Sequence, residues 1–163
     1  MRIIGLDPGL RHLGWGVIEE KPNGFRHIAN GVCKSKGTDL PIRLHSLFKQ
    51  LLAVFSEFRP DEVAVEQVFV NKDPVASLKL GQARAVCLLA PAECNLSVFE
   101  YAPNRVKKTV VGAGHADKAQ VERMLKLQLG QIDFANSDAS DAVAIALCHG
   151  IWRGSNLTKR GAA

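Results

Sequence analysis

The 163-residue chain lacks the sequence features that mark membrane, zinc-binding and repeat proteins. Its longest apolar runs, such as residues 85–92, are far shorter than the roughly 20 residues that a membrane-spanning helix needs. Its four cysteines form no CxxC pair and no paired Cys/His spacing of the zinc type, so we expect reduced thiols that serve as packing residues. Internal repeats, linkers and a basic-then-apolar leader are also lacking, and we therefore expect one soluble, cytoplasmic domain.

The chain does have an ordinary globular composition with an excess of positive charge. Hydrophobic residues make up 47% and charged residues 23%, which suffices for the core of one domain. The net charge of +5 and the pI of about 9.2 are compatible with an anionic partner. Six basic residues crowd into one quarter of the chain: Arg105, Lys107, Lys108, Lys118, Arg123 and Lys126. A solvated, lysine-rich surface would explain this cluster equally well.

Hydrophobic periodicity predicts three strands first and then helices that alternate with strands. Residues 2–7, 14–18 and 25–33 are strand-like, with a Pro-Asn-Gly hairpin signal before the third. Helical spacing of apolar residues predicts the next helix, with Thr38 or Asp39 as its cap and an end at Pro60. The remaining elements are a strand at 62–66, a helix at 74–90, a strand at 97–101, and helices at 103–111, 117–129 and 138–151. This order predicts an α/β fold over residues 1–152, a mixed five-stranded sheet flanked by helices, followed by a disordered basic tail at 153–163.

Two acidic residues stand at the ends of buried strands. Gly5 and Asp7 share a face of the first strand, and Ala64 and Glu66 share a face of the fourth. The small residue before each acid lets a helix approach closely while the acid projects beyond the contact. A carboxylate in such a place is costly unless it is paired, hydrogen-bonded or bound to metal. Capping of the Asp-Pro-Gly turn would also explain Asp7, but it does not explain Glu66, so we favour a functional role for the pair.

A second pair of acids begins the last helix. Ser137 is the expected N-cap, which puts Asp138 and Asp141 in the first turns and on one face. Taken alone, acids at this place more often complement the helix dipole. Small residues follow them, so we expect this helix to pack closely on the sheet at Gly5 and Ala64.

Together the four acids predict a divalent metal site. They would converge from two strand ends and one helix N-terminus, with about four negative charges, and such hard oxygen ligands suit Mg²⁺ or Mn²⁺. Two ions about 4 Å apart can stabilise both the attacking and the leaving oxygen of an in-line phosphoryl transfer. The pattern therefore predicts phosphoryl-transfer chemistry.

These acids belong to an ordered set of motifs that resembles the RuvC-type Holliday junction resolvases of bacteria. The resemblance runs over about residues 2–150 and is specific as a set. It is carried by Gly5–Gly9, Gly14–Val17, Val65–Phe69, Ser77–Arg84, Val106–Gly112, then Gly114, Ala116, Lys118, Gln120 and Val121, and finally Asp138–Ala142. Ser140 stands where the family often has alanine, and its side chain should point away from the metal ligands.

The resemblance implies a fold, an activity and partners. It implies a ribonuclease-H-like fold in which Asp7, Glu66, Asp138 and Asp141 bind two Mg²⁺ ions, with Mn²⁺ as a substitute. It implies a homodimer that nicks two opposing strands of a four-way DNA junction symmetrically, in recombination and repair, because two-fold symmetry suits such paired cuts. It also implies the RuvA–RuvB branch-migration proteins as partners. The residues expected to contact DNA are Phe69, Lys72, Arg84, Arg105, Lys107, Lys108 and Lys118.

Several of these roles have ordinary structural alternatives. Core packing would explain Phe69 as well as base stacking would, although the resemblance favours stacking. Solvation explains Lys107 and Lys118 as well as phosphate contacts do. The apolar circumference of helix 74–90 suits a dimer interface or full burial. His149 could hydrogen-bond a ligand acid, but a helix-end role is more common.

Three other functions share some of these sequence features. Sugar kinases and actin-like ATPases also begin with a strand that ends in Asp-x-Gly, but their second acidic glycine turn and glycine-rich adenosine loop are missing here. The four acids argue against a non-catalytic nucleic-acid-binding domain, because acids that face DNA without a metal ion would repel phosphate. A nuclease of RNA–DNA hybrids would share the mechanism and differ in substrate.

Overall fold

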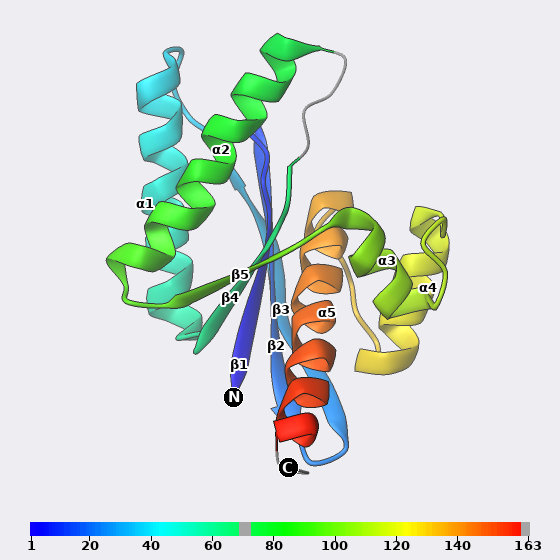
Figure 1. Cartoon of the computed structure of the whole chain (residues 1–163). Helices are drawn as coiled ribbons and strands as arrows, with labels where there is room; N and C mark the ends of the chain where they lie inside the picture. Colours follow the sequence, from blue (N-terminus) through cyan, green and yellow to red (C-terminus); the bar gives the residue numbers. More distant parts are fainter. Residues whose placement is uncertain (69–72, 161–163) are drawn as a thin grey trace.

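The computed structural model describes residues 1–68 and 73–160, with side chains as far as Arg153, and it contains one five-stranded sheet with helices on both faces (Figure 1). The strand order is β3-β2-β1-β4-β5. The antiparallel pairs are β1–β2 and β2–β3, whereas β1–β4 and β4–β5 are parallel. The strands are β1 (Arg2–Asp7), β2 (His12–Lys21), β3 (Gly24–Lys34), β4 (Glu62–Glu66) and β5 (Ser97–Tyr101). The predicted mixed sheet is confirmed, and β2 is longer than expected.

The helices form a layer on each face of the sheet. Two of them, α1 (Leu40–Phe58) and α2 (Pro74–Glu93), cover one face. The other face is covered by α5 (Ser137–Arg160), with α3 (Pro103–Val111) and α4 (Lys118–Leu129) packed beyond it (Figure 1). Their ends follow local chemistry. The Asp73 carboxylate accepts from two backbone N–H groups at the start of α2, and Asp117 and Gln120 form a capping box on α4.

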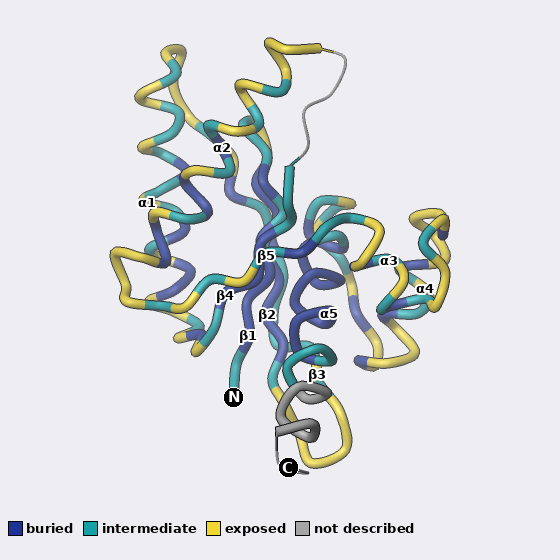
Figure 2. Tube along the Cα trace, viewed as in Figure 1, coloured by how far each residue is buried: buried dark blue, intermediate teal, exposed yellow. Residues whose placement is uncertain are grey.

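The core consists of two clusters separated by the sheet. Ile3 and Ala64 pack with residues of α3, α4 and α5, whereas Ile4 and Leu6 pack with residues of α1 and α2. This division follows from the alternation of side chains along a strand. Figure 2 shows that burial is concentrated in the central strands and in the part of α5 that lies on them.

The contact between α5 and the sheet is close enough to exclude any side chain at two glycines. A Cβ atom on Gly5 would lie 2.0 Å from the carbonyl oxygen of Ala142, and one on Gly14 would lie 2.1 Å from that of Asp138. The expected close packing of this helix at Gly5 is confirmed. As a result, the N-terminus of α5 lies at the end of β1.

Both ends of α5 differ from expectation. The residue that caps the helix is Asn136 and not Ser137, because the Asn136 side-chain oxygen accepts from the backbone N–H of Ala139 at 2.9 Å. The helix then continues to Arg160, whereas we expected a disordered tail from residue 153 onward. Within this longer helix, Arg153 forms an ion pair of 3.0 Å with Glu62, which ties α5 to β4.

All four cysteines are free thiols, as expected, but only three are packing residues. Burial raises the pKa of Cys33 to about 12, and it also raises the pKa values of Cys87 and Cys148. Cys94, at the end of α2, is exposed, so its expected packing role is wrong. Within the described ranges, no helix is both long and apolar enough to cross a membrane.

Candidate active site

The sheet topology brings the two strand acids to one edge. Because β1 and β4 are adjacent and parallel, with Leu6 paired to Val65, Asp7 and Glu66 follow side by side at the carboxyl ends of their strands. Asp7 pairs on its other side with Gly14 of β2. Gly14 in turn is the glycine against which the backbone of Asp138 packs. The first turn of α5 therefore lies beside the same edge of the sheet.

The four expected metal ligands influence each other electrostatically. Each is half-buried. Burial, and after it the negative charges of Glu66, Asp141 and Asp138, together raise the pKa of Asp7 to about 8. Burial and then Asp141 raise the pKa of Glu66 to about 7. Carboxyl groups whose pKa values are raised this far lack enough nearby positive charge to offset their burial and mutual repulsion.

Two side chains that we did not anticipate from the sequence hold or approach Asp138. Asn136 donates a hydrogen bond of 3.0 Å from its side-chain nitrogen to an Asp138 oxygen, while its own oxygen caps α5. The His12 ring nitrogen lies 4.0 Å from the same carboxylate. Asn136 was detectable in the sequence, because asparagine is as good an N-cap as the serine that follows it. The approach of His12 depends on the tertiary fold.

Of the basic residues expected to contact DNA, two lie close to the acids. Lys118 donates a hydrogen bond of 2.9 Å to Asp141, and its charge lowers the pKa values of Asp7 and Glu66. Lys107 also lowers the pKa of Glu66. In return, the hydrogen bond with Asp141 raises the pKa of Lys118. These two lysines therefore belong to the electrostatic surroundings of the carboxylates.

The other expected DNA contacts have separate surroundings. Arg84 forms an ion pair with Glu100, which joins α2 to β5. Arg105 lies over the Trp152 ring, 4.3 Å from its centre, and lines a hollow together with Lys108. Phe69 and Lys72 lie outside the described residues.

Two further expectations concerned α5. The Ser140 hydroxyl donates to Glu122 of α4 at 3.1 Å, so it points away from the four expected metal ligands, as predicted. His149 bonds no acid of the site. Its two ring nitrogens lie 2.7 Å from the Tyr101 hydroxyl and 2.8 Å from Glu62.

The donor set fits a divalent cation. Four half-buried carboxylates, two of which (Asp7 and Glu66) have raised pKa values, offer hard oxygen ligands and an excess of negative charge, as Mg²⁺ or Mn²⁺ requires. As the side chains stand, no three Asp, Glu, His or Cys groups among the described residues are close enough to hold one ion together. Mutual repulsion and the Lys118–Asp141 bond both act to keep the carboxylates apart.

The raised pKa of Asp7 predicts how stability depends on pH when chelator removes metal ions. Between its ordinary pKa near 4 and about 8, the folded state holds more protons than the unfolded state, so this contribution to stability falls as the pH rises. We expect Asp7→Asn to raise the Tm by several degrees at pH 8 and to change it little at pH 4. Thermal unfolding of both proteins in chelator measures this difference, with Asp133→Asn as the control. An equal shift at both pH values would contradict the assignment.

The topology, with acids at the ends of β1 and β4 and at the start of α5, defines a ribonuclease-H-like protein with a carboxylate site. A family model described as crossover junction endodeoxyribonuclease RuvC matches residues 3–149. Relatives of that name from Ruegeria pomeroyi and Rhizobium johnstonii are 59% and 51% identical, covering 93% and 100% of this chain and 92% and 97% of their own. The structure of Thermus thermophilus RuvC in complex with Holliday junction substrate superposes with a TM-score of 0.86 at 34% identity, over 94% of each chain. The chain belongs to the RuvC family of crossover junction endodeoxyribonucleases.

Proposed function

We propose that this chain resolves four-way DNA junctions by metal-dependent phosphodiester hydrolysis, with Asp7, Glu66, Asp138 and Asp141 as the metal ligands. The observation that carries the proposal is the cluster of half-buried acids at one sheet edge, where burial and mutual repulsion raise the pKa of Asp7 to about 8. Family membership over residues 3–149 supports the substrate. The solved relative bound to a Holliday junction supports it as well.

The residues of the site have complementary tasks in this reaction. When bound, two Mg²⁺ ions, or Mn²⁺ in their place, lower the pKa of water and offset the charge of the phosphoryl oxygens. The four carboxylates hold these ions, and their partial burial keeps the electrostatic interactions strong. Asn136 orients one oxygen of Asp138. Lys107 and Lys118 add positive charge beside the acids, which reduces the repulsion of an approaching phosphate.

The decisive experiment is cleavage of a labelled synthetic four-way junction with Mg²⁺, Mn²⁺ or chelator, beside linear duplex and an RNA–DNA hybrid. We expect metal-dependent, paired cuts in the junction alone. Binding without cutting under every ion would make the protein a structure-selective binder. Cleavage of the hybrid instead would retain the mechanism and overturn the substrate.

We further propose that the chain acts as a homodimer joined through α2. Val75, Leu78 and Leu89 are 60–65% exposed on this helix, so it is not fully buried. Ala85 and Ala92 are exposed as well, and the five residues recur at spacings of three, seven, four and three. These spacings place the five residues on one helix face, in an apolar stripe that is interrupted at one position by Gln82. An apolar stripe of this kind suits the same stripe on a second copy, because a two-fold interface is self-complementary.

The dimer proposal predicts the effect of charge on the stripe. We expect Leu78→Glu combined with Leu89→Glu to give a monomer, because two carboxylates in each copy would be buried unpaired. The monomer should replace paired cuts with single nicks. Analytical ultracentrifugation and nicking assays measure both effects, and Leu127→Glu on α4, where the leucine is 72% exposed, is the matched control. A variant that stays dimeric, or a monomer that still makes paired cuts, would disprove this interface.

We also propose a cytoplasmic location and partnership with RuvA–RuvB. Relatives carrying the RuvC name are bacterial proteins, and in bacteria junction DNA lies in the cytoplasm. Co-purification of the three proteins on a four-way junction would test the partnership. Failure of the chain to join RuvA–RuvB on that DNA would contradict it.

A further inference from the structure

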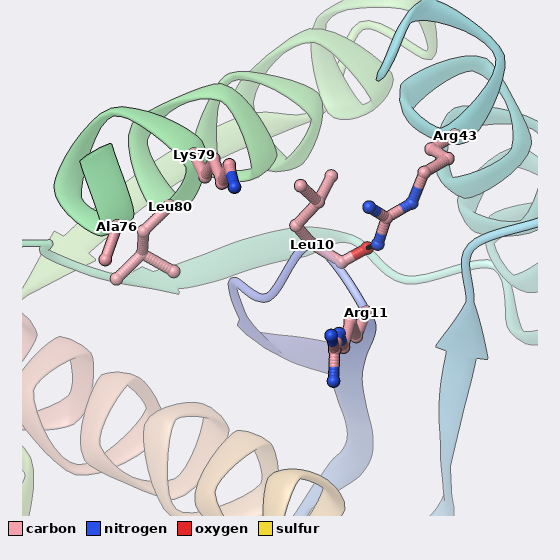
Figure 3. A pocket seen from close by; sticks show the side chains of 6 residues that line it. All are labelled: Leu10, Arg11, Arg43, Ala76, Lys79 and Leu80. Atoms are coloured by element: carbon pink, nitrogen blue, oxygen red, sulfur yellow. Dashed lines mark hydrogen bonds between the residues drawn. The ribbon is translucent and has the colours of Figure 1, made fainter. Parts of the chain in front are cut away.

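A second charged surface lies against the β1–β2 connection, the segment that begins after Asp7. This basic cleft is a hollow of about 440 Å³ between the β1–β2 connection, α1 and α2 (Figure 3). Its lining residues are Leu10, Arg11, Arg43, Ala76, Lys79 and Leu80. Three of the six are cationic and none is acidic. They come from three separate segments, so no single stretch of sequence reveals the cleft.

The positive charge of the cleft has no acidic partner among the residues that the structure describes. Within the described ranges, none of the ion pairs includes Arg11, Arg43 or Lys79. Some other cations of the chain do have acidic partners, as Arg84 with Glu100 and Arg153 with Glu62 show. Three cations around one hollow repel each other, and an anion in the hollow would relieve this repulsion.

One of the three cations is held in place by neutral partners. The Arg43 guanidinium donates to the carbonyl oxygen of Leu10 at 3.2 Å and to the Ser35 hydroxyl at 3.1 Å. These bonds fix its position and leave its charge uncompensated. They also tie the β1–β2 connection to α1. Arg11 and Lys79 are exposed, so their charged ends are accessible from solvent.

One residue of the cleft, Arg11, is close in sequence to Asp7, one of the expected metal ligands. Arg11 is four residues after Asp7, so their Cα atoms are at most about 14 Å apart. Phosphates of one DNA strand follow each other at about 3.4 Å along the helix axis. A strand with its reactive phosphate at Asp7 therefore has other phosphates within reach of Arg11, up to about four nucleotides away. The apolar surfaces of Leu10 and Leu80 suit the sugar that adjoins such a phosphate.

We infer that the basic cleft binds a phosphodiester group of the DNA strand being cut, within about four nucleotides of the scissile phosphate. Arg11 and Lys79 contact the phosphate oxygens. Arg43 adds charge and holds the β1–β2 connection, so that the cleft and Asp7 keep a fixed separation. This inference rests on the proposed function, because it assumes that the strand passes over the carboxylates.

The first test measures the charge contribution of the cleft. The Arg11→Ala, Lys79→Ala double variant should bind a four-way junction about tenfold more weakly in chelator, and the slope of log Kd against log salt should fall by about two. Lys49→Ala, which removes an exposed cation of α1 outside the cleft, is the control for loss of a surface charge and should leave the affinity nearly unchanged. Circular dichroism checks folding. Arg11→Lys with Lys79→Arg should restore most of the salt slope.

The second test locates the phosphate. Methylphosphonate groups, which are neutral, replace the phosphates one at a time on either side of the cut. One position within about four nucleotides should weaken binding by the wild-type protein and have no effect on the double variant. Equal sensitivity of both proteins at every position, or an unchanged salt slope, would overturn the cleft assignment. If the wild type neither binds nor cuts the junction, the proposed function itself fails, which is a distinguishable result.

Discussion

Asp7→Asn and Asp141→Asn should each lower the rate of junction cleavage by about 1,000-fold or more, without weakening junction binding. The amide keeps the size of each side chain but removes a negative charge from the site. A divalent ion then loses an anionic ligand oxygen, and several kcal/mol of transition-state stabilisation are lost with it. Removal of a negative charge also reduces repulsion of the phosphate backbone, so the affinity for DNA should stay equal or rise.

Single-turnover cleavage and a gel-shift assay on the same junction separate the two effects. Asp133→Asn is the matched control, because Asp133 is an exposed acid that none of the ion pairs among the described residues includes. It should cut at the rate of the wild type. If Asp7→Asn kept more than about a tenth of that rate, the carboxylate would not be a metal ligand in the reaction.

Gly5→Ala should destabilise the protein by about 3 kcal/mol or more, at or beyond the upper end of ordinary overpacking. The added Cβ would lie 2.0 Å from the carbonyl oxygen of Ala142 and 2.6 Å from the backbone nitrogen of Ala146. Both neighbours are backbone atoms of a helix, so no side chain can rotate away. Helix α5 must therefore move away from β1, and its first turn, with Asp138 and Asp141, moves as well. Cleavage should fall even where the variant stays folded.

Urea denaturation and the Tm measure this loss, which corresponds to a fall of about 6 °C or more. The control is Gly81→Ala in α2, where an added Cβ meets nothing within 4 Å. That variant should be more stable by about 0.5–1 kcal/mol, because alanine favours the helix over glycine. Equal effects at the two glycines would mean that the α5–β1 contact is looser than its geometry indicates.

Local and periodic features of the fold were predictable from the sequence. Strand alternation placed Gly5 and Asp7 on one face, and the small residues after Asp141 indicated the helix that packs there. Both signals act over a few residues, so they survive without knowledge of tertiary contacts. The ordered motifs then identified the family, which the comparison over residues 3–149 confirmed.

Features that depend on long-range contacts were not predictable in this way. The end of α5 was expected at residue 151, but Arg153 finds its partner Glu62 some ninety residues away in sequence. The basic cleft needs Arg11, Arg43 and Lys79, which only the fold brings together. Asn136 was missed for a different reason, since two adjacent residues were both good N-caps and sequence preference does not separate them.

The unequal surroundings of the cysteines make this chain convenient for distance measurements. Reagents that attack thiolates should leave Cys33, Cys87 and Cys148 unmodified, because all three are buried and their pKa values are raised. Cys94 is exposed at the end of α2, the helix proposed to join two copies. A single spin label or fluorophore therefore attaches to the native sequence at one known point. Paired labels across a dimer would report how its two halves are spaced before and after they meet a junction.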